Sequence, residues 1–281
     1  MMPFECALTA SCMAKTYGWQ TFVAFLRYYP VAFLAFAVFW VWRKGFFQTA
    51  RIQEKFPKLD RLWNETKWSA LTLFIFPAIA TWSVYNGKSG FTQVYTDLNK
   101  YGIAYLFVSF FLLMAIHETY FYWMHRAVHT RKLFKHVHRV HHMSNNPSPL
   151  AAYSFHPLEA ILEGIWLPLT LFVLPIHPLV IFTYANYAMF MNIWWHLGYE
   201  FLPKGFTRGK LTGLLSTSTH HNMHHSHVNC NYSLYWNIWD RVMGTNHPDY
   251  HDYFDAVAER RAAAKKAARL EAEQGLAGSP T

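Results

Sequence analysis

The sequence is poor in charged residues, which make up 15% of its 281 residues, whereas 53% are hydrophobic and 19% are aromatic. An ordinary soluble domain carries about 25% charged residues. Cysteine is also scarce, because the chain has three cysteines and they form no motif. This composition argues against a soluble globular protein and predicts a membrane protein.

A membrane-spanning helix needs about 20 mostly apolar residues, so long apolar stretches test that prediction. One stretch, 158–176, is ambiguous because it contains two glutamates, and we expect it to form half of a re-entrant hairpin with the span 178–195. The mean hydropathy of +0.02 indicates that much of the chain lies outside the bilayer core. The sequence thus predicts an all-α, polytopic membrane protein with about four to five membrane helices: the charge-free spans 68–85, 101–116 and 178–195, and a fourth span at 22–42, which Arg27 and Pro30 weaken.

Basic residues are unevenly distributed among the loops. Segment 43–67 carries seven Lys or Arg residues against three acidic residues, while 86–100 carries two Lys and one Asp. By the positive-inside rule the first loop is cytoplasmic, and counting the following spans places both histidine-rich segments on the cytoplasmic face as a helical cap. The net charge of +9 is then explained by topology and by anionic lipid headgroups, and it predicts no nucleic-acid partner.

Histidine is abundant, with 17 residues, and its spacing is regular. H-R-A-V-H at 125–129 places two histidines four residues apart, and H-R-V-H-H at 138–142 and H-N-M-H-H at 221–225 share the spacing i, i+3, i+4. On a helix these intervals bring imidazoles to one face, with Cβ atoms about 5–6 Å apart. The pattern predicts metal binding, and eight histidines indicate two ions because a zinc site takes about four ligands.

The identity of the metal stays open, since imidazole suits iron, zinc, copper and nickel alike. No acidic residue has the H-E-x-x-H spacing of a hydrolytic zinc site, which favours redox chemistry. A zinc-dependent membrane hydrolase remains one alternative. A metal-binding or transport protein is another, although a transporter would place its ligands near the middle of its membrane helices.

Five further segments extend the pattern: "YWMHRAVH", "FKHVHRVHH", "FHPLE", "HLGYE" and "NYSLYWNIWDRVMGT". In this order they resemble the fatty acid hydroxylase and sterol desaturase superfamily of membrane-bound di-iron oxygenases, in particular its sterol C5-desaturase-like members. The resemblance covers about 101–245. It implies three regions: N-terminal membrane helices with a basic loop at 1–100, a catalytic domain at 101–256, and a charged helical tail at 257–281.

The resemblance also implies the site residues. Asn192 stands where some relatives have a second histidine in the block around "HLGYE", so ligands beyond the nine below stay open. His156, His220 and Asp240 are candidates for supporting a ligand, the alternative for Asp240 being a salt bridge with Arg241. The expected metal ligands are His125, His129, His138, His141, His142, His196, His221, His224 and His225.

The chemistry that the resemblance implies is O2-dependent hydroxylation or desaturation of a membrane lipid, either a sterol or a fatty acyl chain. The expected cofactor is a pair of iron ions, with zinc as an alternative in the isolated protein. The chain shows neither a Rossmann fingerprint nor a cytochrome b5-like segment, so we expect a separate electron donor: a cytochrome b5, a ferredoxin or a reductase. Trp194, Trp195, Tyr199 and the aromatic residues 120–123 are candidates for lining the lipid opening.

Overall fold

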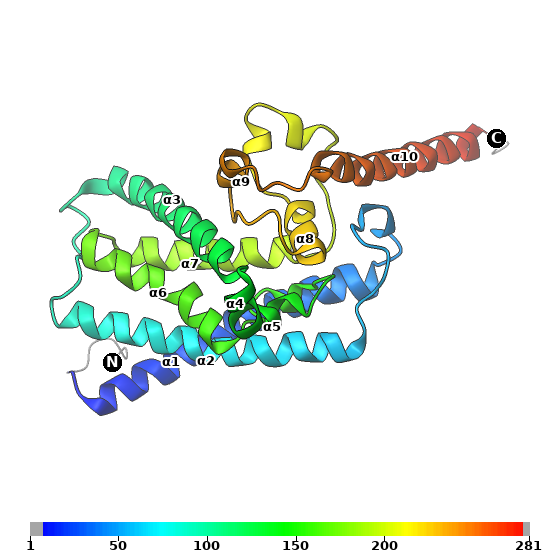
Figure 1. Cartoon of the computed structure of the whole chain (residues 1–281). Coiled ribbons are helices and arrows are strands. Elements are labelled where there is room, and N and C mark those ends of the chain that lie inside the picture. Colours follow the sequence, from blue (N-terminus) through cyan, green and yellow to red (C-terminus); the bar gives the residue numbers. More distant parts are fainter. Residues whose placement is uncertain (1–7, 278–281) are drawn as a thin grey trace.

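The structure is a computed structural model, and it describes residues 8–277 (Figure 1). These residues form helices and loops, with two isolated β-bridges and no β-strand among them, so the all-α prediction is confirmed for this part of the chain. The α-helices are α1 (Ala10–Phe36), α2 (Leu59–Lys88), α3 (Gly102–Val128), α4 (Arg131–Leu133), α5 (Arg139–His142), α6 (Pro157–Val173), α7 (Pro178–Trp195), α8 (Ser218–His227), α9 (Ile238–Met243) and α10 (Tyr250–Ala277). Two π-helical segments, η1 (Ala37–Trp42) and η3 (Phe134–His138), continue α1 and α4, and four short 3-10 segments are η2 (Gln48–Ala50), η4 (Pro149–Ala151), η5 (Phe206–Arg208) and η6 (Thr212–Leu214).

Three helical segments among the described residues are long and apolar enough to cross a membrane: Ala10–Trp42, Leu59–Lys88 and Gly102–Val128, with 33, 30 and 27 residues. At about 1.5 Å per residue they are roughly 40–50 Å long, against a hydrocarbon core of about 30 Å. Each therefore extends beyond the bilayer core. The chain is an integral membrane protein, and these helices start earlier or end later than the predicted spans 22–42, 68–85 and 101–116.

Helices α6 and α7 form the predicted hairpin, joined by residues 174–177. Both start with the same sequence, His-Pro-Leu. In each case the histidine ring, of His156 or His177, accepts the N–H of the leucine two residues later, and the proline occupies the first helical turn. Helices α6 and α7 have 17 and 18 residues, about 26–27 Å, and neither is among the three described helices that are long and apolar enough to cross a membrane, so the predicted span 178–195 is not one of them.

The hairpin packs on α3 through a core that includes Leu113 of α3, Trp166 of α6 and Tyr184 of α7. Figure 1 shows the turn of this hairpin at the same end of the bundle as loop 89–101, and the segments 129–156 and 196–249 together toward the other end. Both histidine-rich segments therefore lie on one side of the membrane helices.

Buried hydrogen bonds attach the histidine-bearing segment to the membrane helices. The backbone oxygen of Leu150 accepts from the Tyr28 hydroxyl at 2.9 Å and from Ser69 Oγ at 2.8 Å, which ties the loop before α6 to α1 and α2. On the other side of the cap, α10 packs Tyr250 and Phe254 against Met223 of α8. Helix α10 continues without a break across the predicted region boundary at 257, and residues 1–7 and 278–281 of the predicted terminal regions lie outside the described residues.

Candidate metal centre

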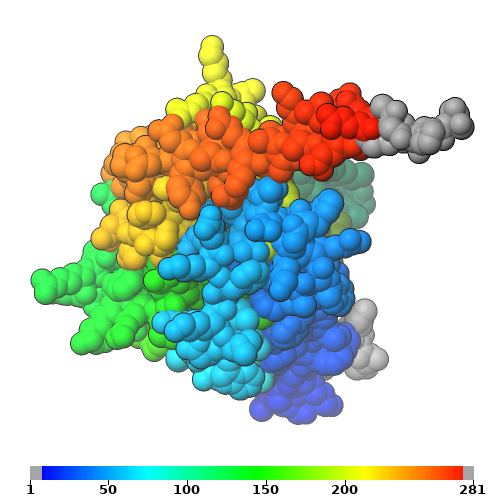
Figure 2. Space-filling view, turned by 90° about the vertical axis from the view of Figure 1, so that its right-hand side faces the viewer, coloured from blue at the N-terminus to red at the C-terminus, as the bar shows by residue number. Residues whose placement is uncertain are grey.

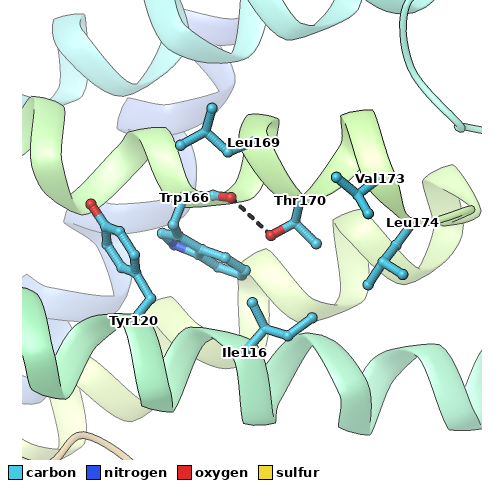
Figure 3. A pocket seen from close by; sticks show the side chains of 7 residues that line it. All are labelled: Ile116, Tyr120, Trp166, Leu169, Thr170, Val173 and Leu174. Carbon is cyan, nitrogen blue, oxygen red and sulfur yellow. Dashed lines mark hydrogen bonds between the residues drawn. The ribbon is translucent and has the colours of Figure 1, made fainter.

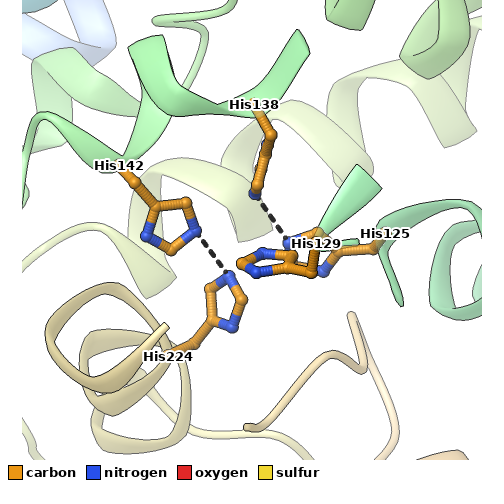
Figure 4. A group of neighbouring side chains, drawn as sticks. All are labelled: His125, His129, His138, His142 and His224. Atoms are coloured by element: carbon orange, nitrogen blue, oxygen red, sulfur yellow. Dashed lines mark hydrogen bonds between the residues drawn. The ribbon is translucent and has the colours of Figure 1, made fainter. Parts of the chain in front are cut away.

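Nine histidines form two groups beside α5 and α8, and within each group one ring nitrogen of every member lies within 4.8 Å of the others. Group 1, drawn in Figure 4, consists of His125, His129, His138, His142 and His224. Group 2 consists of His141, His196, His221 and His225. Together they contain all nine histidines that the sequence analysis names as ligands, and the described part of the chain adds no other side chain to either group.

Each H-x-x-H-H motif contributes to both groups: the first gives two histidines to group 1 and one to group 2, and the second gives one to group 1 and two to group 2. In the first motif His138 and His142 belong to group 1 and His141 belongs to group 2. In the second motif the two histidines spaced by four residues belong to group 2, and His224 belongs to group 1. One residue rotates an α-helix by about 100°, so adjacent histidines point in different directions and each motif reaches both groups.

The ring nitrogens approach one another at distances that suit a shared ion. The Nε2 atoms of His142 and His224 are 3.0 Å apart, as are those of His196 and His221. Two nitrogens that each lie about 2.1 Å from one ion, at a right angle, are about 3.0 Å apart. A hydrogen bond accounts for the approach of only two rings. A shared ion in each group would account for the convergence of all five rings of group 1 and all four rings of group 2.

The hydrogen bonds of His125 and His138 support a cation between these two rings. His125 Nδ1 lies 2.8 Å from the backbone oxygen of Tyr232, and His138 Nδ1 lies 2.6 Å from Glu159 Oε1. A backbone carbonyl can only accept, so His125 Nδ1 donates and its Nε2 presents a lone pair. His138 Nε2 presents a lone pair in the same way when the Glu159 carboxylate is ionised and accepts from Nδ1. These lone pairs face each other at 3.1 Å, an arrangement that a cation between them stabilises.

Two further rings are oriented in the same way. His196 Nδ1 lies 2.8 Å from the backbone oxygen of Asn192, and His224 Nδ1 lies 2.7 Å from that of Cys230. Such bonds to the second ring nitrogen are usual for metal-ligating histidines, because they fix the tautomer and the ring orientation. Asn192 thus supports His196 through its backbone.

The imidazole of His129 is unsatisfied, since both of its ring nitrogens are buried without a hydrogen bond. Leaving a buried polar atom unsatisfied costs about 1–3 kcal/mol, which a metal bond would offset. Burial also lowers the pKa of His142 to about 3 and that of His196 to about 4. The imidazoles are therefore neutral at neutral pH, which is the form that binds metals.

Sequence reasoning missed Glu159, which it interpreted as a charge that interrupts a membrane stretch. No acidic residue has the H-E-x-x-H spacing in the sequence, yet a carboxylate does lie beside the histidines in space, because Glu159 is buried against His138. The available signal was an acidic residue in an otherwise apolar helix, which is costly and usually functional. Its contact with Nδ1 makes Glu159 a residue that orients the His138 imidazole.

Three other buried carboxylates hold backbone segments around the groups. Glu118 of α3 accepts the N–H groups of residues 234–236, and Glu200 accepts from the N–H and Oγ1 of Thr219 in α8. Asp240 accepts the N–H groups of Tyr232 at 2.9 Å and Ser233 at 2.7 Å. Burial alone would raise the pKa of Asp240, but hydrogen bonds from His220, Thr245 and Ser233 outweigh it and hold the pKa below its usual value.

The three residues that the sequence marked as supporting candidates lie outside both groups. His156 caps α6. His220 points to Asp240, with Nε2 3.3 Å from Oδ2, and not to a grouped imidazole. Asp240 contacts His125 only indirectly, through the backbone of Tyr232, and the described contacts of Arg241 are with Thr207 and not with Asp240.

A cavity of about 370 Å³ lies between α3 and α6 (Figure 3). Ile116 and Tyr120 of α3 face Trp166 and Val173 of α6 across it, and its lining is almost entirely apolar. Trp166 is two helical turns, about 10 Å, from Glu159 along α6. Of the aromatic residues expected at a lipid opening, Tyr120 lines this cavity, whereas Trp195 and Tyr199 are buried in the protein core.

The fold and the site define an integral membrane protein of the histidine-rich kind, in which the histidines cluster at one end of the membrane helices. Comparison with known proteins shows that residues 110–245, just under half of the chain, match the fatty acid hydroxylase family. This match and the sterol-modifying relatives support the fatty acid hydroxylase and sterol desaturase superfamily that the motifs predicted.

The curated relatives are sterol-modifying enzymes by name. The chain is 30% identical to lathosterol oxidase of Rattus norvegicus over 183 residues, which cover 61% of this chain and 58% of the relative. It is 29% identical to a Delta(7)-sterol 5(6)-desaturase of Gibberella zeae over 188 residues, which cover 67% of this chain and 54% of the relative. The chain thus spans somewhat more than half the length of these relatives, and no solved structure matches it.

Proposed function

We propose that the protein is an O2-dependent lipid hydroxylase or desaturase that holds two iron ions, one in each histidine group. The observation that carries this proposal is the convergence of nine buried, neutral imidazoles into two adjacent groups at the end of a membrane bundle. The family match supports the reaction class, and the names of the relatives support a sterol as the first substrate to test.

The donor set fits iron better than zinc. Group 1 offers five imidazoles, whereas zinc sites in proteins generally use four ligands in a tetrahedron. Imidazole is a common ligand of iron, and a site with more than four donors suits a metal that prefers higher coordination. Zinc is the metal that would replace iron in a protein isolated without control of its metal supply.

When bound, the iron pair would supply the activation of O2 for attack on an unactivated C–H bond. The protein's own residues orient and shield that centre. Glu159 and the Tyr232 carbonyl hold two imidazoles of group 1 in place, while Tyr28 and Ser69 fix the loop around Leu150 to α1 and α2. Burial of the imidazoles excludes bulk water, which would otherwise compete for the centre.

The cavity between α3 and α6 is the proposed place for the apolar part of the lipid. It lies among membrane helices, and α6 leads from Trp166 to Glu159 beside group 1. Hydroxylation removes one hydrogen atom from the substrate and adds oxygen to the same carbon, whereas desaturation removes a second hydrogen atom from the adjacent carbon. The product therefore depends on how the substrate is placed. We therefore propose the reaction class and leave both products as outcomes of the test.

The decisive experiment is lipid analysis of membranes with and without the protein, in air and without O2. We expect a sterol or acyl lipid that gains one oxygen atom or loses two hydrogen atoms only in air, together with iron in the purified protein. A product that forms without O2, with zinc as the only metal, would favour the zinc hydrolase. Bound metal without any lipid product would favour the metal-binding alternative.

A further inference from the structure

Four cationic side chains form a patch on the surface that covers group 1. Arg131 and Lys132 of α4, Lys135 of η3 and Arg139 of α5 are all exposed, and none of them makes an ion pair or a side-chain hydrogen bond with another described residue. We call these four residues the basic patch. The surrounding segment 119–158 contains one more Arg and no Asp or Glu, so the positive charge of the patch is uncompensated locally. The green part of the chain, which includes the patch, projects at the left edge of Figure 2.

A single aromatic side chain separates this patch from the imidazoles. Phe134, between the patch residues in the chain, is half-buried, and its ring centroid lies 5.5 Å from those of both His129 and His142. The ring of His138 is 6.1 Å away. The π-helical segment η3 thus directs Phe134 inward while Lys135 points outward. A molecule bound on the patch is about one side chain from group 1.

The proposed reaction needs electrons at that position, and the following inference rests on the proposed function. Hydroxylation turns a C–H bond and O2 into an alcohol and water, and it consumes two electrons and two protons. Desaturation turns two C–H bonds and O2 into a double bond and two water molecules, and it also consumes two electrons and two protons. The lipid does not supply these electrons, so a reductant must approach the centre in each turnover.

We infer that the basic patch is the docking surface for an acidic, one-electron carrier protein, which delivers two electrons in two successive encounters and leaves oxidised each time. Opposite charges steer such transient encounters and raise the association rate constant. Anionic lipid headgroups would also bind cations, but they do not account for the position of the patch above Phe134 and group 1. A carrier protein accounts for both the charge and the position.

The test measures binding of the isolated haem domain of cytochrome b5, used as an acidic one-electron probe, to the full chain in nanodiscs of neutral phosphatidylcholine. The patch variant is Lys132→Glu with Lys135→Glu. The matched control is Lys55→Glu with Lys58→Glu, two exposed lysines with the same spacing in the loop between α1 and α2. We expect the patch variant to lower the association rate constant at low salt by at least about tenfold, and the control by less than about threefold.

A second measurement follows the absorbance of the reduced haem after mixing with the iron-loaded protein. The patch variant should reoxidise the carrier more slowly at low carrier concentration, and its iron content should equal that of the unmodified protein. Equal effects of the two variants, or no binding of the carrier, would refute the docking surface. Phosphatidylserine that stays bound to the protein through purification is measured for both variants. If the patch variant retains less of it while carrier binding is unchanged, the patch is a lipid site and the docking surface is refuted.

Failure of the lipid reaction is distinguishable from failure of this surface, because carrier binding is measured without substrate or turnover. If no lipid product is found but the carrier binds through the patch, the lipid substrate class is wrong and the docking surface stands. If lipid oxidation is found and the patch variant binds the carrier normally, the docking surface is wrong and the oxygenase stands.

Discussion

Replacement of Glu159 by Gln should weaken the metal in group 1 more than the metal in group 2. Glu159 Oε1 lies 2.6 Å from His138 Nδ1, and both side chains are almost fully buried, so the substitution removes a carboxylate from a site without water to replace it. Outer partners of metal-ligating histidines are typically worth 10–100-fold in metal affinity. We therefore expect a loss of about 1.4–2.8 kcal/mol in group 1, by the conversion of about 1.4 kcal/mol for each factor of ten.

The assay is removal of iron by graded chelator, with iron per chain measured after each step. The Glu159→Gln protein should release one iron at a 10–100-fold lower chelator concentration and keep the other longer. Glu163→Gln is the matched control, because it makes the same change one turn later on α6, where the described hydrogen bonds include no histidine contact. Equal release of both ions, or the same result for the two variants, would show that Glu159 does not act through His138.

Other changes test the grouping, the supporting carboxylate, the cavity and the orientation. Alanine at His224 should remove iron chiefly from group 1, and alanine at His225 chiefly from group 2, with loss of turnover but normal membrane insertion in both; iron analysis and membrane fractionation check this. Asp240→Ala should destabilise the cap by about 1–3 kcal/mol, because it leaves two buried backbone N–H groups unpaired, and thermal unfolding in detergent measures the loss. Trp166→Ala should enlarge the α3–α6 cavity and raise KM for the native lipid more than it changes kcat, and unchanged kinetics would separate the cavity from substrate binding. Cysteine labels in segments 129–136 and 226–229 should react from the cytoplasm, and labelling of the two segments from opposite sides would contradict the shared centre.

The histidine spacing indicates which rings share a helix face, but not how they divide into two groups. The structure brings the eight spaced histidines together with His196, which only the resemblance implied, and metal binding by these nine stays a prediction. Which ring joins which group depends on how α8 meets α5, and that approach is a property of the tertiary packing. The assignment of His141 and His224 away from their closest neighbours in sequence therefore needed the structure.

The hydropathy pattern located the membrane helices, although their ends differ from the apolar stretches. Helix α3 continues past residue 116 to Val128, because the polar residues of its last turns contact the cap and not lipid. Glu118 shows why composition cannot reveal this, since its carboxylate is satisfied by N–H groups more than a hundred residues later in the chain. Such long-range partners leave no local pattern in the sequence.

The opposite use of the two H-x-x-H-H motifs limits how far apart the two histidine groups can be. His141 and His142 are adjacent in the chain, yet they serve different groups, and the same holds for His224 and His225. Their ring centroids are 5.9 Å apart in both pairs. The separation of the two centres is therefore set by neighbouring residues of one backbone, whose Cα atoms are about 3.8 Å apart, and not by the distance between helices. A bilayer of different thickness can tilt the membrane helices and change lipid access while the spacing of the two centres stays constant.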